Sequence, residues 1–142
     1  MKQIHLLTLI IAAAVLTGYA ARADGIAETT APFPGAKSQW EGFDRYDFQF
    51  DNHPAIVVVP KQLLPGKRWA WRAEFFGAFA NADAALVTNG FYLVYLGVPD
   101  LFGSPEATKS WDEFYAELTG KYGFAKKAAL IGLSRGGLYC YN

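Results

Sequence analysis

KAALIGLSRGG, residues 127–137, is an apolar run that leads directly into a serine between two glycines. The run is short and apolar, so we predict a buried strand over Lys127 to Leu133. A helix is predicted to follow, so the chain must turn from strand to helix within about one residue. Such a turn strains the backbone of Ser134 and leaves no room for side chains at Gly132 and Gly136.

Upstream of this turn, the spacing of apolar residues indicates further strands. A predicted strand begins near Phe43, where aromatic and polar residues alternate over residues 46–51, and residues 55–59 are mostly β-branched. Together they predict an antiparallel hairpin closed by Asp51-Asn52-His53-Pro54. Two more strands are predicted over Arg68 to Phe75 and over Phe91 to Val98, the second apolar on both faces.

Two helices are predicted between these strands. Asn81 is expected to cap the first helix, which runs through Thr88. Ser104-Pro105-Glu106 starts the second, with a capping hydroxyl and a proline in the first turn, and Gly120 or Gly123 ends it. Alternating strands and helices predict an α/β fold, with a five-stranded sheet that is parallel after the first hairpin and has helices on its faces.

Residues 1–23 have the composition of a secretory signal peptide. An apolar run from Leu6 to Leu16 precedes the small-residue cleavage site Ala21-Arg22-Ala23. The run has about half of the roughly 20 residues that a membrane-spanning helix needs, and a retained N-terminal anchor is the alternative. We therefore expect a secreted or periplasmic protein without a stable membrane anchor after cleavage. Residues 24–40 are expected to form a flexible leader arm, and residues 41–142 the folded domain.

Composition excludes several classes of protein. The chain is 52% hydrophobic and 16% aromatic, which is incompatible with a disordered linker. It has 13 basic and 13 acidic residues, so no nucleic-acid partner is expected. Cys140 is the only cysteine and His53 the only histidine after the signal peptide, so we expect no internal disulfide, no metal site and no cofactor.

The serine turn matches G-x-S-x-G and resembles the nucleophile elbow of the α/β-hydrolase superfamily. WAWRAEFFG at 69–77 and DLFGSPE at 100–106 are similar to a secreted bacterial branch of that superfamily. The resemblance covers residues 41–142. It implies a three-layer α/β-hydrolase-type sheet in which the elbow follows the fifth strand, so that this chain, truncated just after the elbow, is the N-terminal half of the domain.

The resemblance also implies residue roles. Ser134 would be the nucleophile, and the backbone N–H of Arg135 would be one oxyanion donor. The second donor would come from the loop after the third strand, at the N–H of Phe76 or else of Phe75. The histidine that the superfamily often has in that loop is missing here. The rings of Phe75 and Phe76 are expected to pack in the core or line the cleft.

A complete triad cannot be found in the sequence. In the superfamily an acid and then a histidine follow the serine, but the eight residues after Ser134 include neither. We expect both to lie beyond the chain end, and the chain alone to be inactive. His53 is expected to be a solvated turn residue and Cys140 a packing residue. Glu74 and Asp100 lie at the carboxyl ends of predicted strands, where Asp100 in particular could line the cleft.

The function that the resemblance implies is that of an exported serine esterase. It would act on a small-molecule or polysaccharide-linked acyl ester through an acyl-enzyme, and an aromatic rim of Trp69, Trp71, Phe75 and Phe76 favours such a substrate. A peptidase of the prolyl-oligopeptidase kind is the enzymatic alternative. A non-catalytic exported interaction domain could also retain the elbow as architecture, and the serine could simply cap a helix after a glycine-rich turn.

Overall fold

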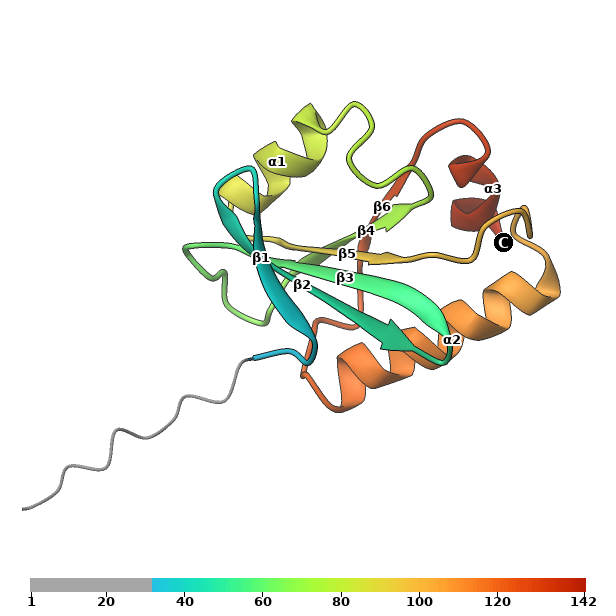
Figure 1. Ribbon diagram of the computed structural model, residues 1–142, viewed down its shortest axis with the longest axis horizontal. Coiled ribbons are helices and arrows are strands. Elements are labelled where there is room, and N and C mark those ends of the chain that lie inside the picture. Colours follow the sequence, from blue (N-terminus) through green and yellow to red (C-terminus); the bar gives the residue numbers. More distant parts are fainter. Residues whose placement is uncertain (1–31) are drawn as a thin grey trace, which may run out of the picture. The chain divides into compact units, whose positions relative to one another are not determined.

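One six-stranded sheet forms the centre of the fold. The computed structural model describes residues 32–142, so the predicted signal peptide and the first part of the predicted arm lie outside the described residues. The sheet order is β1-β2-β3-β5-β4-β6 (Figure 1). The strands are β1 (Ala36–Trp40), β2 (Phe43–Phe50), β3 (His53–Val59), β4 (Trp69–Ala73), β5 (Tyr92–Leu96) and β6 (Ala129–Gly132).

Pairing is antiparallel from β1 to β5 and parallel beyond. β2 pairs antiparallel with β1 and β3, and β3 antiparallel with β5. β4 is parallel to both β5 and β6. The predicted α/β class and the predicted antiparallel hairpin are therefore confirmed, in a mixed sheet.

The strand β1 corrects the prediction of five strands and of an arm through residue 40. Its residues are exposed except for the partly buried Trp40, so they show no alternation of apolar and polar side chains. The register of β1 against β2 comes instead from the turn Glu41-Gly42, where both residues have positive φ. An ion pair between Lys37 of β1 and Asp44 of β2, at 2.8 Å, accompanies this turn. Just before the strand, Phe33 is only 4% exposed and packs in the core.

The turn between β2 and β3 is tighter than predicted. Asp51 and Asn52 alone form it, with φ of 45° and 62°, and Phe50 pairs with His53. Asparagine and aspartate tolerate the left-handed region that such two-residue turns require. β3 therefore begins at His53 rather than at the predicted Ala55.

Three helices accompany the sheet: α1 (Asn81–Thr88), α2 (Pro105–Gly120) and α3 (Gly136–Tyr141). The predicted cap of α2 is confirmed, since Ser104 Oγ accepts a hydrogen bond from the N–H of Ala107 at 3.4 Å. The bounds of α1 agree with the prediction, but its cap does not. Ala80 occupies the N-cap position, and Asn81 is the first helical residue.

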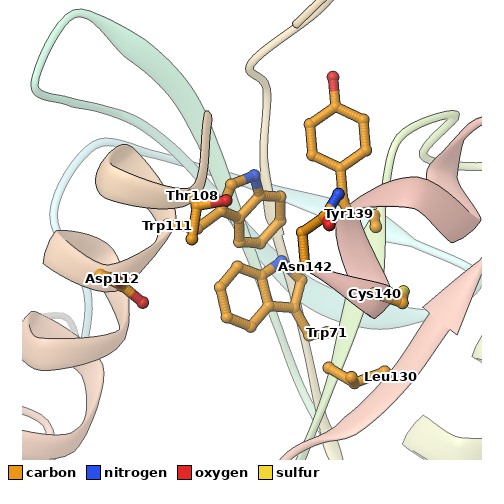
Figure 2. Close-up of a pocket in the computed structure, with 9 residues that line it drawn as sticks. Trp71, Thr108, Trp111, Asp112, Leu130, Tyr139, Cys140 and Asn142 are labelled. Atoms are coloured by element: carbon orange, nitrogen blue, oxygen red, sulfur yellow. The ribbon is translucent and has the colours of Figure 1, made fainter. Parts of the chain in front are cut away.

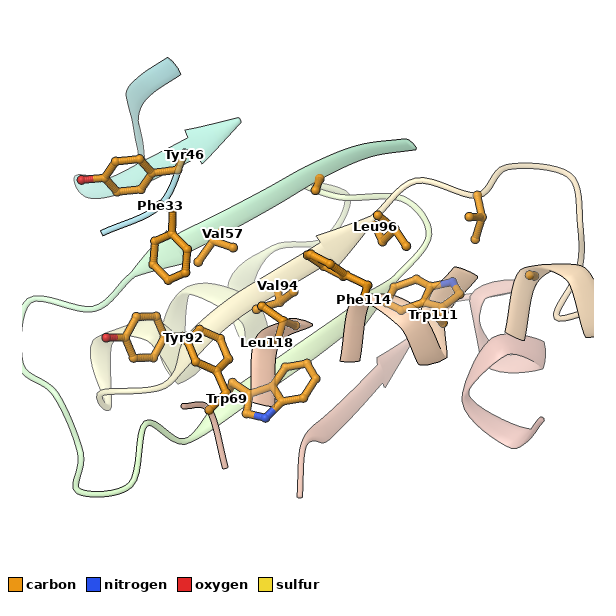
Figure 3. Packing of buried hydrophobic residues seen from close by; sticks show 14 residues of the cluster. Phe33, Tyr46, Val57, Trp69, Tyr92, Val94, Leu96, Trp111, Phe114 and Leu118 are labelled. Carbon is orange, nitrogen blue, oxygen red and sulfur yellow. The ribbon is translucent and has the colours of Figure 1, made fainter. Parts of the chain in front are cut away.

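The core lies on both faces of the sheet. Successive residues of a strand point to opposite faces, and they belong to separate apolar clusters. Val57, Trp69 and Val94 pack with Phe114 and Leu118 of α2 (Figure 3). The second cluster contains Val87 of α1 together with Ile56, Val58, Ala70 and Leu93. The two helices thus cover opposite faces, and β4, β5 and β6 end at one common edge.

Candidate active site

Backbone strain is concentrated at the edge where β4, β5 and β6 end. Ten non-glycine residues among residues 32–142 have positive φ, and six of them lie in the loops at this edge. Left-handed backbone in ordinary residues costs free energy and clusters at functional sites. The six are Glu74, Phe75, Phe79, Asp100, Phe102 and Ser134.

Ser134 lies in the turn between β6 and α3 with φ of 51°. A Cβ on Gly132 would lie 2.7 Å from Gly137 Cα, and a Cβ on Gly136 would lie 2.3 Å from the carbonyl oxygen of Ala73. Both distances are shorter than side chains tolerate. The crowding predicted at these two glycines is therefore present, and we call residues 132–136 the elbow.

The side chain of Arg135 connects the elbow to two neighbouring loops. Its Nε donates to Glu74 Oε2 at 3.1 Å, and its Nη1 lies 3.0 Å from Asp100 Oδ1. The guanidinium carbon also lies 5.2 Å and 5.3 Å from the ring centroids of Phe75 and Phe102. The hydrogen bond to Glu74 raises the pKa of Arg135, which stays charged. Phe75 and Asp100, the predicted cleft residues, are thus brought together around Arg135.

Glu74 and Tyr139 extend this network below the surface. Glu74 is 8% exposed, and its Oε1 accepts a hydrogen bond from the Tyr139 hydroxyl at 2.8 Å. That hydroxyl also accepts from the N–H of Phe102 at 3.0 Å. Burial, together with Glu74, raises the pKa of Tyr139, which therefore remains protonated. Sequence reasoning missed Tyr139, which sits five residues after the serine without any motif to mark it.

A buried arginine, Arg72 of β4, lies under the loop 74–78. Arg72 is 3% exposed, and its guanidinium donates to the carbonyl oxygens of Glu74, Phe75 and Ala78 and to Asp83 Oδ1. Asp83 is fully buried, and burial raises the pKa of its carboxyl against the opposing effect of the Arg72 charge. Sequence reasoning missed this pair as well, although a charged residue within the buried strand WAWRA was a signal.

The two candidate oxyanion donors of the loop differ in their side chains. The ring of Phe76 packs 5.5 Å from that of Trp40 and 5.7 Å from that of Tyr95, centroid to centroid. The ring of Phe75 is 37% exposed. Within the described residues, the backbone N–H groups of Phe75, Phe76 and Arg135 make no hydrogen bond. All three N–H groups therefore lack a protein partner among the described residues.

His53 is not the solvated turn residue that the sequence predicted. It is half-buried at the start of β3, with Nδ1 3.2 Å from the carbonyl oxygen of Gly97 and Nε2 3.4 Å from Ser110 Oγ. These contacts connect β3 to β5 and α2. Both ring nitrogens are occupied, so the side chain has a structural role.

The predicted aromatic rim is corrected in part. Trp69 is fully buried, and Trp71 lines a cavity of about 260 Å³ between α2 and α3 that Ser134 does not line (Figure 2). Cys140 lines the same cavity, and burial raises the pKa of its thiol, as suits a packing residue rather than a nucleophile. The exposed rings at the strand ends are Phe75, Phe79 and Phe102.

Chemically, this edge offers the hydroxyl of a serine with a strained backbone, Ser134, and backbone N–H groups without a partner in the described residues. In residues 32–142 no group of three or more histidine, cysteine or acidic side chains is arranged to hold a metal ion. No helix in the part of the chain that the structure describes is long and apolar enough to cross a membrane. Comparisons of the chain with protein families, with curated proteins and with solved structures give no match.

Proposed function

We propose that this chain is the nucleophile-bearing part of a serine hydrolase of the α/β-hydrolase type, an exported esterase. The observation that carries the proposal is the elbow, in which Ser134 has φ of 51° between two glycines that have no room for a Cβ. The sheet order adds support. When β1 is left aside, the strand before the serine is the fifth and pairs with the third, after an antiparallel hairpin.

The proposed reaction is acyl transfer through Ser134. Its Oγ adds to the ester carbonyl while a base takes the proton, and the alcohol leaves with that proton to give an acyl-enzyme. Water then releases the acid and regenerates the serine. The N–H groups of Arg135 and of Phe76 or Phe75 are proposed to bind the developing oxyanion, since none of them has a partner among the described residues.

The base and its acid are proposed to lie on a segment that follows Asn142. His53 is the only histidine in residues 32–142, and both of its ring nitrogens are engaged. The Glu74 and Asp100 carboxylates are paired with Arg135 and so are not free to orient a distant histidine. From this we also expect residues 24–142 alone to lack efficient turnover.

The proposed substrate is an acyl ester, free or linked to a polysaccharide, met outside the cytoplasm after the signal peptide is removed. The exposed rings of Phe75 and Phe102 next to Arg135 support an apolar group on that ester. A prolyl-oligopeptidase-like peptidase and a non-catalytic interaction domain remain the alternatives, and the experiment below separates them.

The test uses the protein expressed from its whole reading frame. A fluorophosphonate probe should label the wild type and should fail to label Ser134→Ala. Ser38→Ala, which removes an exposed serine of β1, is the control and should be labelled. The circular dichroism spectrum of Ser134→Ala should match that of the wild type, which shows that the variant is folded. Labelling that persists in Ser134→Ala contradicts the assigned nucleophile. An unlabelled wild type supports the non-catalytic domain. Faster turnover of a prolyl peptide than of p-nitrophenyl esters supports the peptidase.

A further inference from the structure

In the loop 74–78, a single side chain, that of Arg72, donates hydrogen bonds to three backbone carbonyl groups. Arg72 Nε donates to the carbonyl of Glu74 at 3.3 Å, and Nη2 donates to the carbonyls of Phe75 at 3.2 Å and Ala78 at 2.6 Å. Nη1 donates to Asp83 Oδ1 at 3.3 Å. The planar fork of the guanidinium makes these contacts at once, which the single nitrogen of a lysine cannot do.

This pattern determines where the N–H groups of the loop point. In a trans peptide the carbonyl and the N–H of the next residue lie on opposite sides of the peptide unit, and the described residues contain no cis peptide. Because the carbonyls of Glu74 and Phe75 point towards the buried guanidinium, the N–H groups of Phe75 and Phe76 point away from it. Neither N–H has a hydrogen-bond partner in residues 32–142.

The loop also begins against the elbow. A Cβ on Gly136 would meet the carbonyl oxygen of Ala73 at 2.3 Å, which shows how closely the two backbones approach. Glu74 then binds Arg135, the residue after the serine, through its side chain. Glu74 and Phe75 both have positive φ, a strained backbone that needs support from its surroundings. The bonds from Arg72 provide that support at both residues.

We propose that Arg72 is a positioning residue for the oxyanion site. By holding the carbonyls of Glu74 and Phe75 beneath the loop, it presents the N–H groups of Phe75 and Phe76 to the oxyanion, beside the N–H of Arg135. Asp83 neutralises the buried guanidinium and so lets it remain there. This role of Arg72 rests on the proposed function. It specifies how the N–H groups of Phe75 and Phe76 are oriented before substrate binds.

The first experiment compares Arg72→Lys with Leu118→Ala in the protein from the whole reading frame. Leu118 of α2 is fully buried in the cluster that α2 forms with the sheet, away from this loop, so its loss lowers the unfolding temperature without altering the donors. With active sites titrated by fluorophosphonate, Arg72→Lys should lower kcat by about 100- to 1000-fold while KM changes little. Its affinity for a trifluoromethyl ketone should fall in parallel. Leu118→Ala should keep kcat per titrated site.

A kcat for Arg72→Lys within about threefold of the wild type overturns the role, while labelling of wild-type Ser134 keeps the proposed function intact. An unlabelled wild type contradicts the proposed function itself, so the two failures are distinct.

The second experiment needs no variant and covers the case in which Arg72→Lys does not fold. Amide proton shifts are measured in the wild type as a trifluoromethyl ketone adds to Ser134. The N–H of Phe75 or Phe76 should move downfield together with that of Arg135. The N–H of Ala78, which donates to the carbonyl of Phe75 at 3.0 Å, should move little and serves as an internal reference. A bound inhibitor that leaves the amides of both phenylalanines unmoved overturns the role.

Discussion

At the residue scale, the elbow depends on glycines at positions where a Cβ atom would clash with neighbouring backbone. The space beside Gly136 is filled by the backbone carbonyl of Ala73, which cannot move without displacing β4. Beside Gly137, the next residue, there is no atom within 4 Å of a built Cβ. The close approach therefore requires glycine at Gly136 but not at Gly137, and a pair of substitutions tests this difference.

Gly136→Ala should lower the free energy of unfolding by about 1–3 kcal/mol, because its methyl group overlaps backbone. Gly137→Ala should leave it unchanged or raise it by about 0.5–1 kcal/mol, because alanine favours the helix α3. Urea unfolding followed by circular dichroism measures both. Equal effects of the two substitutions would show that the close approach of β4 and the elbow is not rigid.

We expect the ionisation of Asp83 to make the stability of the protein depend on pH. Burial raises the folded-state pKa of its carboxyl above the ordinary value of 3.8, so the folded state holds this proton more tightly than the unfolded state does. The stability that this proton provides is complete below the unfolded pKa and is lost as pH rises through the raised folded pKa. The free energy of unfolding of the wild type minus that of Asp83→Asn should therefore fall as pH rises from about 4. A difference that increases with pH contradicts the shift.

At the scale of elements, β1 and Phe33, which precedes it, belong to the fold rather than to a flexible arm. Phe33 contacts the rings of Tyr46, Tyr92, Tyr122 and Phe124 at centroid distances from 4.9 to 6.2 Å. This single side chain connects residues before β1 with β2, β5 and the segment after α2. Phe33 is therefore buried where the chain leads into the edge strand, whereas the side chains of β1 itself are largely exposed.

Phe33→Ala should therefore lower the free energy of unfolding by about 3–5 kcal/mol, as loss of a buried phenylalanine does. Phe79→Ala is the matched control, because Phe79 is 84% exposed and its truncation should change stability by no more than about 0.5 kcal/mol. Thermal unfolding of the two variants compares them directly. A Phe33→Ala protein as stable as the control would show that Phe33 does not hold the predicted flexible arm against the fold.

At the scale of the whole molecule, we expect the open edge of β6 to govern behaviour in solution. Among the described residues β6 pairs only with β4, and Leu130 on it is 55% exposed. Leu138 and Tyr141 of α3 are 47% and 93% exposed nearby along the chain. Unpaired apolar edges pair with other chains, so this edge favours self-association.

Residues 24–142 produced alone should elute from size-exclusion chromatography as oligomers or aggregates and unfold without one sharp transition. Leu130→Lys should shift the protein towards the monomer, because a charge on an edge strand opposes edge-to-edge pairing. Lys127→Gln, a change just before β6 that adds no charge, serves as the control. A wild-type monomer with a cooperative transition would show that the open edge is tolerated.

The same polypeptide should hydrolyse p-nitrophenyl esters no faster than its Ser134→Ala variant does. A nucleophile without its base loses many powers of ten in rate even when the rest of the site is intact. Rapid turnover that depends on Ser134 would show that a base lies within residues 24–142, and would direct attention to the surroundings of His53.

Much of the fold could be predicted because its signals are local. The alternation at Tyr46, Phe48 and Phe50, the cap at Ser104 and the glycines of the elbow each depend on neighbours a few residues apart. The side chains around the elbow could be predicted less well. Arg135 and Glu74 are separated by 61 residues, and nothing in either segment indicates that they meet.

The sequence by itself determined the α/β class, the hairpin, the main helices and the turn at Ser134, because periodicity, capping and steric exclusion act over short distances. Only the tertiary structure decided that β1 joins the sheet, that Trp69 is core rather than rim, and that Arg72 holds the loop 74–78 from beneath. The physical reason is that burial and long-range hydrogen bonds depend on which segments the folded sheet brings together.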